Sequence, residues 1–222
     1  MNSTDWRLIQ DNAWPMLEAL LRVTIPLTAL SFLLGLILAL FVALARLSSR
    51  KYLSLPARAF ISAVRGTPLL VQLSLIYYGL PQFGIQIDPF PSAVIAFSVN
   101  VAGYAAEVIR ASILSIPKGQ WEAGTTVGMD YGTTLRRIIL PQASRTAVPP
   151  LSNTLISLLK DTSLASVITV NEMFRVAQVA SAQSFQFFTL YLVAAVYYWV
   201  VCVALSAGQN RLEARFDRYV AR

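Results

Sequence analysis

The chain has 222 residues, of which 56% are hydrophobic, 13% are charged and 11% are aromatic, and its formal net charge is +7. Soluble domains carry about 25% charged residues, so roughly half of the usual charge is missing. Disordered chains combine low hydrophobicity with high net charge, which excludes disorder, and so few charges disfavour an ordinary soluble surface. The composition therefore indicates an integral membrane protein.

Two further features of the composition limit the chemistry. The sequence contains no histidine, which excludes histidine acid–base catalysis and histidine metal sites. Its single cysteine, Cys202, lies in an apolar run, where we interpret it as a small core residue. One cysteine cannot build a thiolate cluster either, so we expect no metal site.

Five segments have the length of about 20 residues that a helix needs to cross the hydrocarbon of a bilayer. The first and last, residues 23–45 and 187–208, contain no charged residue. The three between them, residues 58–80, 92–114 and 147–169, contain polar or ionisable side chains. The sequence therefore predicts an all-α integral membrane protein, a single domain over residues 1–222 with five transmembrane helices.

The basic residues are sorted between the two sides of this arrangement. Thirteen of the 18 bases fall after the first span, after the third span or in the tail: Arg46, Arg50, Lys51, Arg58, Arg110, Lys118, Arg136, Arg137, Arg145, Arg211, Arg215, Arg218 and Arg222. Cytoplasmic segments concentrate Lys and Arg, so the N-terminus is predicted outside and the C-terminus in the cytoplasm. A cleaved signal peptide is disfavoured because Asp5, Asp11 and Glu18 precede the first apolar run.

The second, third and fourth spans hold the polar residues that the outer two lack. Ionisable groups in hydrocarbon cost several kcal/mol and usually face a bundle interior or an aqueous path. A substrate pathway lined by these three spans is our working hypothesis, with these candidate residues: Gln72, Asn100, Glu107, Lys160 and Asp161. Within the second span, Pro68 follows Arg65-Gly-Thr, so a kink is expected there, with Arg65 reaching the inner surface.

The third span places Asn100, Tyr104, Glu107 and Arg110 on one helical face. This face either lines the pathway or forms a helix contact in which Glu107 and Arg110 pair near the cytoplasmic boundary. Both alternatives keep it away from lipid.

The fourth span is interrupted by Lys160-Asp161-Thr-Ser. A helix broken at Asp161 would offer a half-helix N-terminus, or the Lys160 ammonium, to a substrate carboxylate. The alternative is an ion pair to another span or subunit.

The cytoplasmic loop, about residues 117–141, predicts two short helices. The first is ended by Gly128, and the second is capped by Asp130 and stops at Pro141. An ordered loop of this size is usually functional, and we expect it to dock a soluble partner. Its predicted packing anchors are Trp121, Leu135 and Ile138. No phosphate-binding P-loop pattern occurs in the sequence, which therefore gives no indication that this chain binds and hydrolyses ATP itself.

This loop resembles the cytoplasmic signature of bacterial ABC importer permeases, which is Glu-Ala-Ala, three residues, Gly, nine residues and Ile-x-Leu-Pro. The matching residues are Glu122, Ala123, Gly124, Gly128, Ile138, Leu140 and Pro141, with Gly124 in place of the second alanine. The segments 65–72, 107–113 and 158–164 are similar to further blocks of the polar amino-acid branch of this family. Within that branch the overall similarity is greatest to permeases for L-cystine.

The resemblance implies the fold of a type I importer permease in the bacterial inner membrane and a role in importing a polar L-amino acid. It also implies the partners: a cytoplasmic ATP-binding subunit that holds ATP and Mg, a second permease subunit that we expect to form a homodimer with this one, and an extracytoplasmic substrate-binding protein. The loop would couple to the ATPase, and the polar segment 171–186 on the outer face would either contact the binding protein or gate the entrance. This chain would bind no cofactor of its own, would not be an enzyme, and would have no nucleic-acid partner.

Two other functions remain open from the residues alone. A self-sufficient secondary transporter or channel is disfavoured by the odd number of spans and by the absence of a visible inverted repeat. A membrane scaffold that transports nothing is disfavoured by the ionisable residues inside three spans.

Overall fold

The computed structural model describes residues 3–217, with side chains described from Trp6 to Ala214, and these residues form helices and no strand. Of the predicted cytoplasmic tail, Arg218, Arg222 and the side chain of Arg215 lie outside this description. Helices α1 (Ser3–Ala19), η1 (Leu20–Thr24) and α2 (Ile25–Leu47) join into one long rod. Its part from Trp6 to Leu47 has 42 residues and is about 63 Å long, so it extends well beyond the predicted first span.

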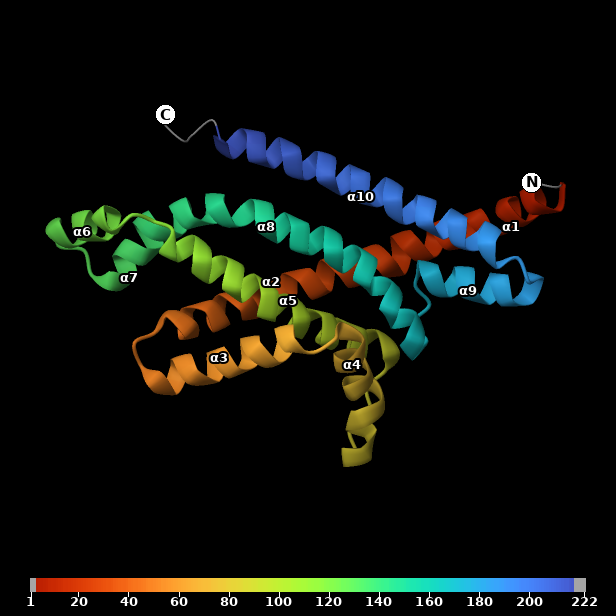
Figure 1. Cartoon of the computed structure of the whole chain (residues 1–222), viewed down its shortest axis with the longest axis horizontal. Coiled ribbons are helices and arrows are strands. Elements are labelled where there is room, and N and C mark those ends of the chain that lie inside the picture. Colours follow the sequence, from red (N-terminus) through yellow and green to blue (C-terminus); the bar gives the residue numbers. More distant parts are fainter. Residues whose placement is uncertain (1–2, 218–222) are drawn as a thin grey trace.

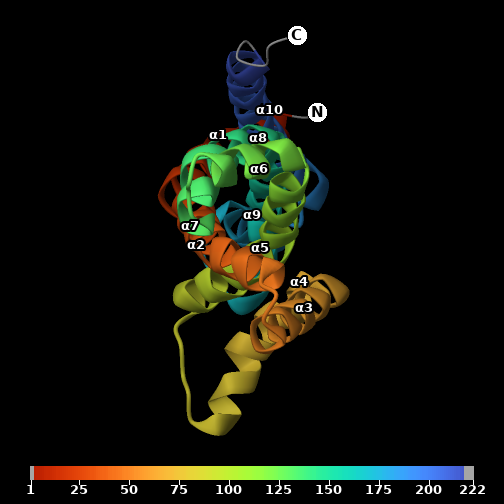
Figure 2. The ribbon, with the colours of Figure 1, turned by 90° about the vertical axis from the view of Figure 1, so that its left-hand side faces the viewer.

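The predicted kink at the second span is confirmed as a sharp break. Helix α3 (Lys51–Gly66) ends at Thr67, which has extended backbone angles, and Pro68 starts α4 (Leu69–Ser74). Proline disfavours helical geometry at the residue before it, which explains why the break falls here. The chain continues through η2 (Leu75–Gly79) and η3 (Leu80–Phe83), and this second half is bent by 105° from α3. It projects from the rest of the molecule as an arm (Figure 2).

Helix α5 (Pro89–Leu114) leads to the predicted loop, where α6 (Lys118–Thr126) and α7 (Tyr131–Thr134) form. The prediction that the second loop helix stops at Pro141 is wrong. The chain stays helical through η4 (Leu135–Ile139), a π-helical turn, into α8 (Leu140–Asp161). Inside a continuous helix a proline removes one hydrogen bond and its ring crowds the carbonyl of the preceding turn, and the π-helical turn just before Pro141 gives the ring room.

The last part of the chain places helices at the opposite end of the molecule from α6 and α7 (Figure 1). After Asp161 the helix tightens into η5 (Thr162–Ile168), a 3₁₀ segment. Helix α9 (Met173–Ser184) falls within the predicted polar stretch, and α10 (Phe187–Asp217) runs back along the bundle.

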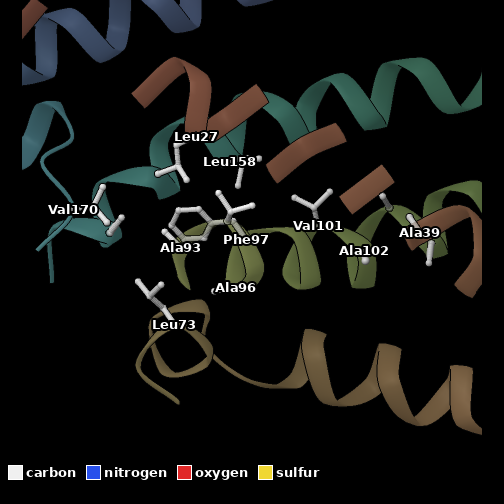
Figure 3. Close-up of a cluster of buried hydrophobic side chains, with 14 of the residues drawn as sticks. Leu27, Ala39, Leu73, Ala93, Ala96, Phe97, Val101, Ala102, Leu158 and Val170 are labelled. Atoms are coloured by element: carbon white, nitrogen blue, oxygen red, sulfur yellow. The ribbon is translucent and has the colours of Figure 1, made fainter. Parts of the chain in front are cut away.

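The core gathers around α5. Phe97, Val101 and Ala102 of this helix lie between α2 residues such as Leu27 and Ala39 on one side and Leu73 of the arm on another (Figure 3). Small residues make this packing possible. A Cβ on Gly103 would lie 2.5 Å from Val64 Cγ1, and one on Gly35 would lie 2.6 Å from Val101 Cγ1. Close approach at glycine is typical of helix pairs in membranes.

Three helical stretches are long and apolar enough to cross a membrane: Trp6–Leu47, Pro89–Leu114 and Phe187–Ala214. The bent pair of α3 with α4–η3 would make a fourth. The described chain is thus a multi-helix membrane protein.

Candidate functional site

The loop predicted to dock a partner forms a small helical unit that is fixed to the end of α8. The Trp121 ring stacks on Tyr131 with 5.2 Å between centroids, and Gln142 Nε2 donates to Gln120 Oε1 at 3.1 Å. All three predicted anchors pack around the buried side chains of Ile113, Ile139 and Ala143, and so does Leu140. Glu122 and Ala123 remain exposed on α6, so the unit presents them outward while its other face is held.

Gly124, which replaces an alanine of the signature, is explained by its neighbour. It is buried, and a Cβ there would meet the Thr134 side chain at 2.6 Å from Cγ2 and 2.7 Å from Oγ1. The branched threonine thus occupies the space that a methyl group would need. Glycine at this position therefore permits the close contact between α6 and α7.

The turn between the two loop helices depends on Gly128 and Asp130. Gly128 has φ +80°, a left-handed conformation that favours glycine. Asp130 Oδ1 accepts the Thr133 N–H at 3.0 Å and caps α7, and hydrogen bonds from Thr133 hold the pKa of this exposed carboxyl below its usual value. The predicted end of α6 and the predicted cap are therefore confirmed, while Pro141 lies exposed in the first turn of α8.

A cavity of about 390 Å³ lies where the α3–α4 break meets α5 and α8. Asn100 and Tyr104 of α5 line it together with Asp161 at the end of α8. The backbone at Thr67 and Pro68 forms the wall at the break. Two of the five predicted pathway residues, Asn100 and Asp161, therefore share one cavity at a place where two helices are interrupted.

Gln72 stands behind this cavity and supports it. Its Nε2 donates to the Val64 carbonyl at 2.8 Å, the Thr67 carbonyl at 3.1 Å and Thr67 Oγ1 at 3.0 Å. Its Oε1 accepts from Asn100 Nδ2 at 3.2 Å. The amide thus satisfies carbonyls that the helix break leaves without partners, and it orients Asn100.

Glu107 and Arg110 do not line this cavity, but they pair with each other as one of the two sequence alternatives predicted. Arg110 Nε donates to both carboxylate oxygens of Glu107 at 3.0 Å, and the side chains are about three-quarters covered. Arg65 lies closer to the cavity, because its guanidinium carbon sits 5.5 Å from the centroid of the Tyr104 ring. The Arg65 side chain is exposed, and its expected reach to the inner surface stays a prediction.

Lys160 and Asp161 point to different places, as adjacent residues on a helix should. Lys160 lines a separate cavity of about 280 Å³ with Phe174, Tyr191 and Tyr198. Neither side chain forms an ion pair with another span in the part of the chain described. The helix does change character after Asp161, although it tightens into η5 instead of restarting as a new helix.

Sequence reasoning missed Glu172. This carboxylate is fully buried, and it accepts hydrogen bonds from Phe174 N at 2.8 Å, Arg175 N at 2.6 Å and Tyr198 Oη at 2.9 Å. It caps α9 and ties this helix to α10. Its position before Met173 as a helix cap was the available signal, but nothing local indicated its burial.

Comparison with known proteins decides the family of this chain. The model of the family "binding-protein-dependent transport system inner membrane component" matches residues 6–218. The chain belongs to this family. This inner membrane component is 57% identical over 218 residues to the L-cystine transport system permease protein TcyB of Bacillus subtilis, covering 98% of this chain and 93% of that one. It is 37% identical to the glutamine transport system permease protein GlnP of Escherichia coli, covering 95% and 97%.

Solved structures agree with this assignment. The inner membrane component matches a crystal structure of an amino acid ABC transporter with histidines at a TM-score of 0.89 and 35% identity, covering 97% of this chain and all of that one. A chain of the MetNI methionine ABC transporter, at 18% identity and a TM-score of 0.72, shares the fold. The fold is thus that of ABC importer permeases, and the relatives are transport subunits for amino acids.

Proposed function

We propose that this inner membrane component is the transmembrane permease subunit of an ATP-driven importer that brings L-cystine into the bacterial cytoplasm. The observation that carries the substrate is the 57% identity to the L-cystine permease TcyB over nearly the whole of both chains. In this proposal the chain is one domain with five spans, including the bent second one and α8, in the inner membrane. The N-terminus lies outside and the C-terminus in the cytoplasm.

The proposed pathway passes the cavity between the α3–α4 break, α5 and α8. An amino acid carries an ammonium and a carboxylate, so it needs an anionic acceptor and polar donors within one site. Asp161 is suited to receive the ammonium, and the Asn100 amide is suited to the carboxylate. Gln72 fixes Asn100, whereas Glu107 and Lys160 do not line this cavity and Lys160 lines a separate one.

The proposed coupling unit is α6–α7, with Glu122, Ala123, Gly124 and Gly128. It is held by Ile138 of η4 and Leu140 of α8, and the exposed Pro141 follows in the first turn of α8. Its exposed carboxylate at Glu122 would meet a cytoplasmic ATPase subunit, which holds ATP and Mg. Because α7, η4 and α8 follow one another without a gap, a displacement of the loop would be transmitted along one helix to Asp161. This continuity supports a mechanical link between ATP binding and the pathway.

The remaining partners are an extracytoplasmic binding protein and a second permease copy. We favour a homodimer, since two-fold dimers of identical chains are the commonest oligomers. L-cystine consists of two identical amino-acid halves joined by a disulfide, so a symmetric pair of pockets would offer each half the same groups.

The test is uptake of labelled L-cystine into proteoliposomes that contain the permease, its ATPase and the binding protein. We expect uptake to require ATP and the ATPase, and to be competed by unlabelled cystine far better than by arginine or glutamine. Flux by the permease alone, independent of ATP, would contradict the proposal.

The coupling unit has its own test. Glu122→Ala should lower co-purification of the ATPase or uncouple ATP hydrolysis from uptake, while the permease still inserts in the membrane. Thr126→Ala, on the same exposed helix, is the matched control and should leave both unchanged. If the two variants had the same ATPase co-purification and the same coupling of hydrolysis to uptake, Glu122 would not contribute to the contact with the ATPase.

A further inference from the structure

A second cavity, of about 650 Å³, lies at the end of the molecule that carries α6 and α7. It opens between the end of α2, the turn into α3 and the start of α7 and η4. We name it the α2–α7 groove, and its lining includes Phe41, Leu44, Leu47, Ser48, Leu53 and Tyr131. None of the residues that line the proposed substrate cavity takes part in it.

The groove changes from apolar to polar along its length. Phe41 and Leu44 belong to the uncharged run of residues 23–45, which has the length and composition of a hydrocarbon-spanning helix. The Phe41 side chain is 65% exposed, so it faces outward from the bundle. Beyond the end of α2, Ser48 and Ser49 add hydroxyls to the lining. One end of the groove therefore lies at membrane depth and the other at the membrane boundary.

Four basic residues directly follow lining residues of the groove in the sequence. Arg50 and Lys51 directly follow the lining serines, and Arg136 and Arg137 directly follow the lining residue Leu135. All four side chains are exposed, and none forms an ion pair among the residues with described side chains. Arg50 Nη1 does donate to Tyr52 Oη at 2.9 Å.

The nearest acid along the chain does not neutralise this charge. Asp130 precedes the lining residue Tyr131, but its carboxylate accepts the Thr133 N–H and caps α7. Four exposed bases thus directly follow residues that line the groove, although none of the four lines it. Basic sites next to membrane helices on the cytoplasmic side suit anionic lipid headgroups.

We propose that the α2–α7 groove binds an anionic glycerophospholipid, with an acyl chain against Phe41 and Leu44 and the phosphate near the four bases. The proposal rests on the proposed function in one respect, namely the orientation that places this end at the cytoplasmic leaflet. A soluble partner does not reach a wall at hydrocarbon depth, and a second copy packed here by two-fold symmetry would bring the same bases toward one another. A lipid meets both the apolar and the charged requirement.

The consequence is a lipid-filled contact between the first span and the coupling unit. Tyr131 both lines the groove and stacks on Trp121 of α6. A bound lipid would therefore pack against the same aromatic pair that holds the proposed coupling helix in place.

The first experiment maps the site on the wild-type assembly of permease and ATPase. The probe is a phosphatidylglycerol with a photoreactive acyl chain, compared with a phosphatidylcholine of identical chains. We expect crosslinks in peptides that contain residues 41–53 or 131–135, and several-fold more labelling by phosphatidylglycerol. Equal labelling by both lipids, or labels confined to α10, would overturn the proposal.

The second experiment tests the charges by native mass spectrometry of the same assembly, with the two lipids supplied in equal amounts. The double variant Arg50→Gln with Lys51→Gln should lose the preference for phosphatidylglycerol several-fold. Arg58→Gln with Arg211→Gln removes the same charge from exposed positions outside the groove and should keep the preference. An unchanged preference in the groove variant, or an equal loss in both variants, would overturn the proposal.

Neither experiment uses substrate or ATP, so its result is independent of transport. Intact groove labelling with no cystine uptake would count against the proposed function alone. Normal uptake with no headgroup preference would count against the lipid site alone.

Discussion

Helices α5 and α10 both contain an apolar stretch that could cross a membrane, but the protein buries about 61% of the first stretch and 11% of the second. The less apolar of the two is the more buried, with a mean hydropathy of 1.5 against 2.1. In a soluble protein the order would be the reverse. In a bilayer, lipid covers large apolar side chains as well as protein does, so small and polar residues mark the contacts between helices.

The two helices differ in what they contribute. Helix α5 supplies Phe97 and Val101 to the core, Asn100 to the substrate cavity and Glu107 to an ion pair. Helix α10 is buried where Leu190 and Ala194 contact its neighbours, while Trp199 and Val203 beyond them are exposed. We infer that α5 is the central wall of the pathway and that α10 mainly faces lipid.

The strongest way to break this comparison is to enlarge one glycine in each helix. Gly103→Leu on α5 should destabilise the permease by about 1–3 kcal/mol, because even its Cβ would lie 2.5 Å from Val64 Cγ1. A Cβ at Gly208 on α10 would have no atom within 4 Å, so Gly208→Leu should leave stability unchanged. The midpoint of thermal unfolding in detergent checks both. Equal shifts in the two variants would show that burial does not separate these helices.

The buried carboxyl group of Glu172, which accepts a hydrogen bond from Tyr198 of α10, predicts that the stability of the protein depends on pH. Burial raises the pKa of Glu172 from 4.5 to about 7, against hydrogen bonds from Phe174, Tyr198 and Arg175 that lower it. Between these values the folded state holds a proton that the unfolded state releases, so this group contributes stability that is lost as pH rises through about 7. The wild-type midpoint should therefore be higher at pH 5.5 than at pH 8.

The matched variant for this prediction is Glu172→Gln, which cannot ionise. Its midpoint should vary less with pH over the same range, whereas Glu213→Gln, at the far end of α10, should keep the wild-type dependence. A wild-type midpoint that rises from pH 5.5 to pH 8 would contradict the assignment.

The smallest expected effect compares two ion pairs. Glu107→Gln in the pair of α5, whose side chains are about three-quarters covered, should cost roughly 0.5–1 kcal/mol. Glu18→Gln in the more exposed pair with Arg22 should cost about 0.5 kcal/mol or less. A larger loss of stability in the Glu18 variant than in the Glu107 variant would contradict the stronger contribution expected from the more buried pair.

The sequence predicted features that depend on neighbours along the chain. The break at Pro68, the two loop helices, the cap at Asp130 and the pair of Glu107 with Arg110 were all found. Each follows from spacing, proline or glycine geometry, or a helical face, which act over a few residues.

Features that depend on distant contacts were not predictable in this way. Three features can be found only when it is known which helices meet. They are the hydrogen bonds of Gln72 to Val64 and Asn100, the burial of Glu172 beside Tyr198, and the separate cavities that Lys160 and Asp161 line. The helix through Pro141 was missed because a π-helical turn before it admits the ring, and no residue type marks such a turn.

The central claim is that polar groups on the covered helices line the path of the substrate, and Asp161→Asn tests it most directly. Uptake of labelled L-cystine by the full assembly in proteoliposomes should fall at least about tenfold, since a loss of one charge-assisted contact is worth more than 1.4 kcal/mol. ATPase co-purification should stay at the wild-type level. Asp88→Asn, the same chemical change outside the cavity, is the control and should transport normally. Wild-type uptake by the Asp161 variant would contradict the account.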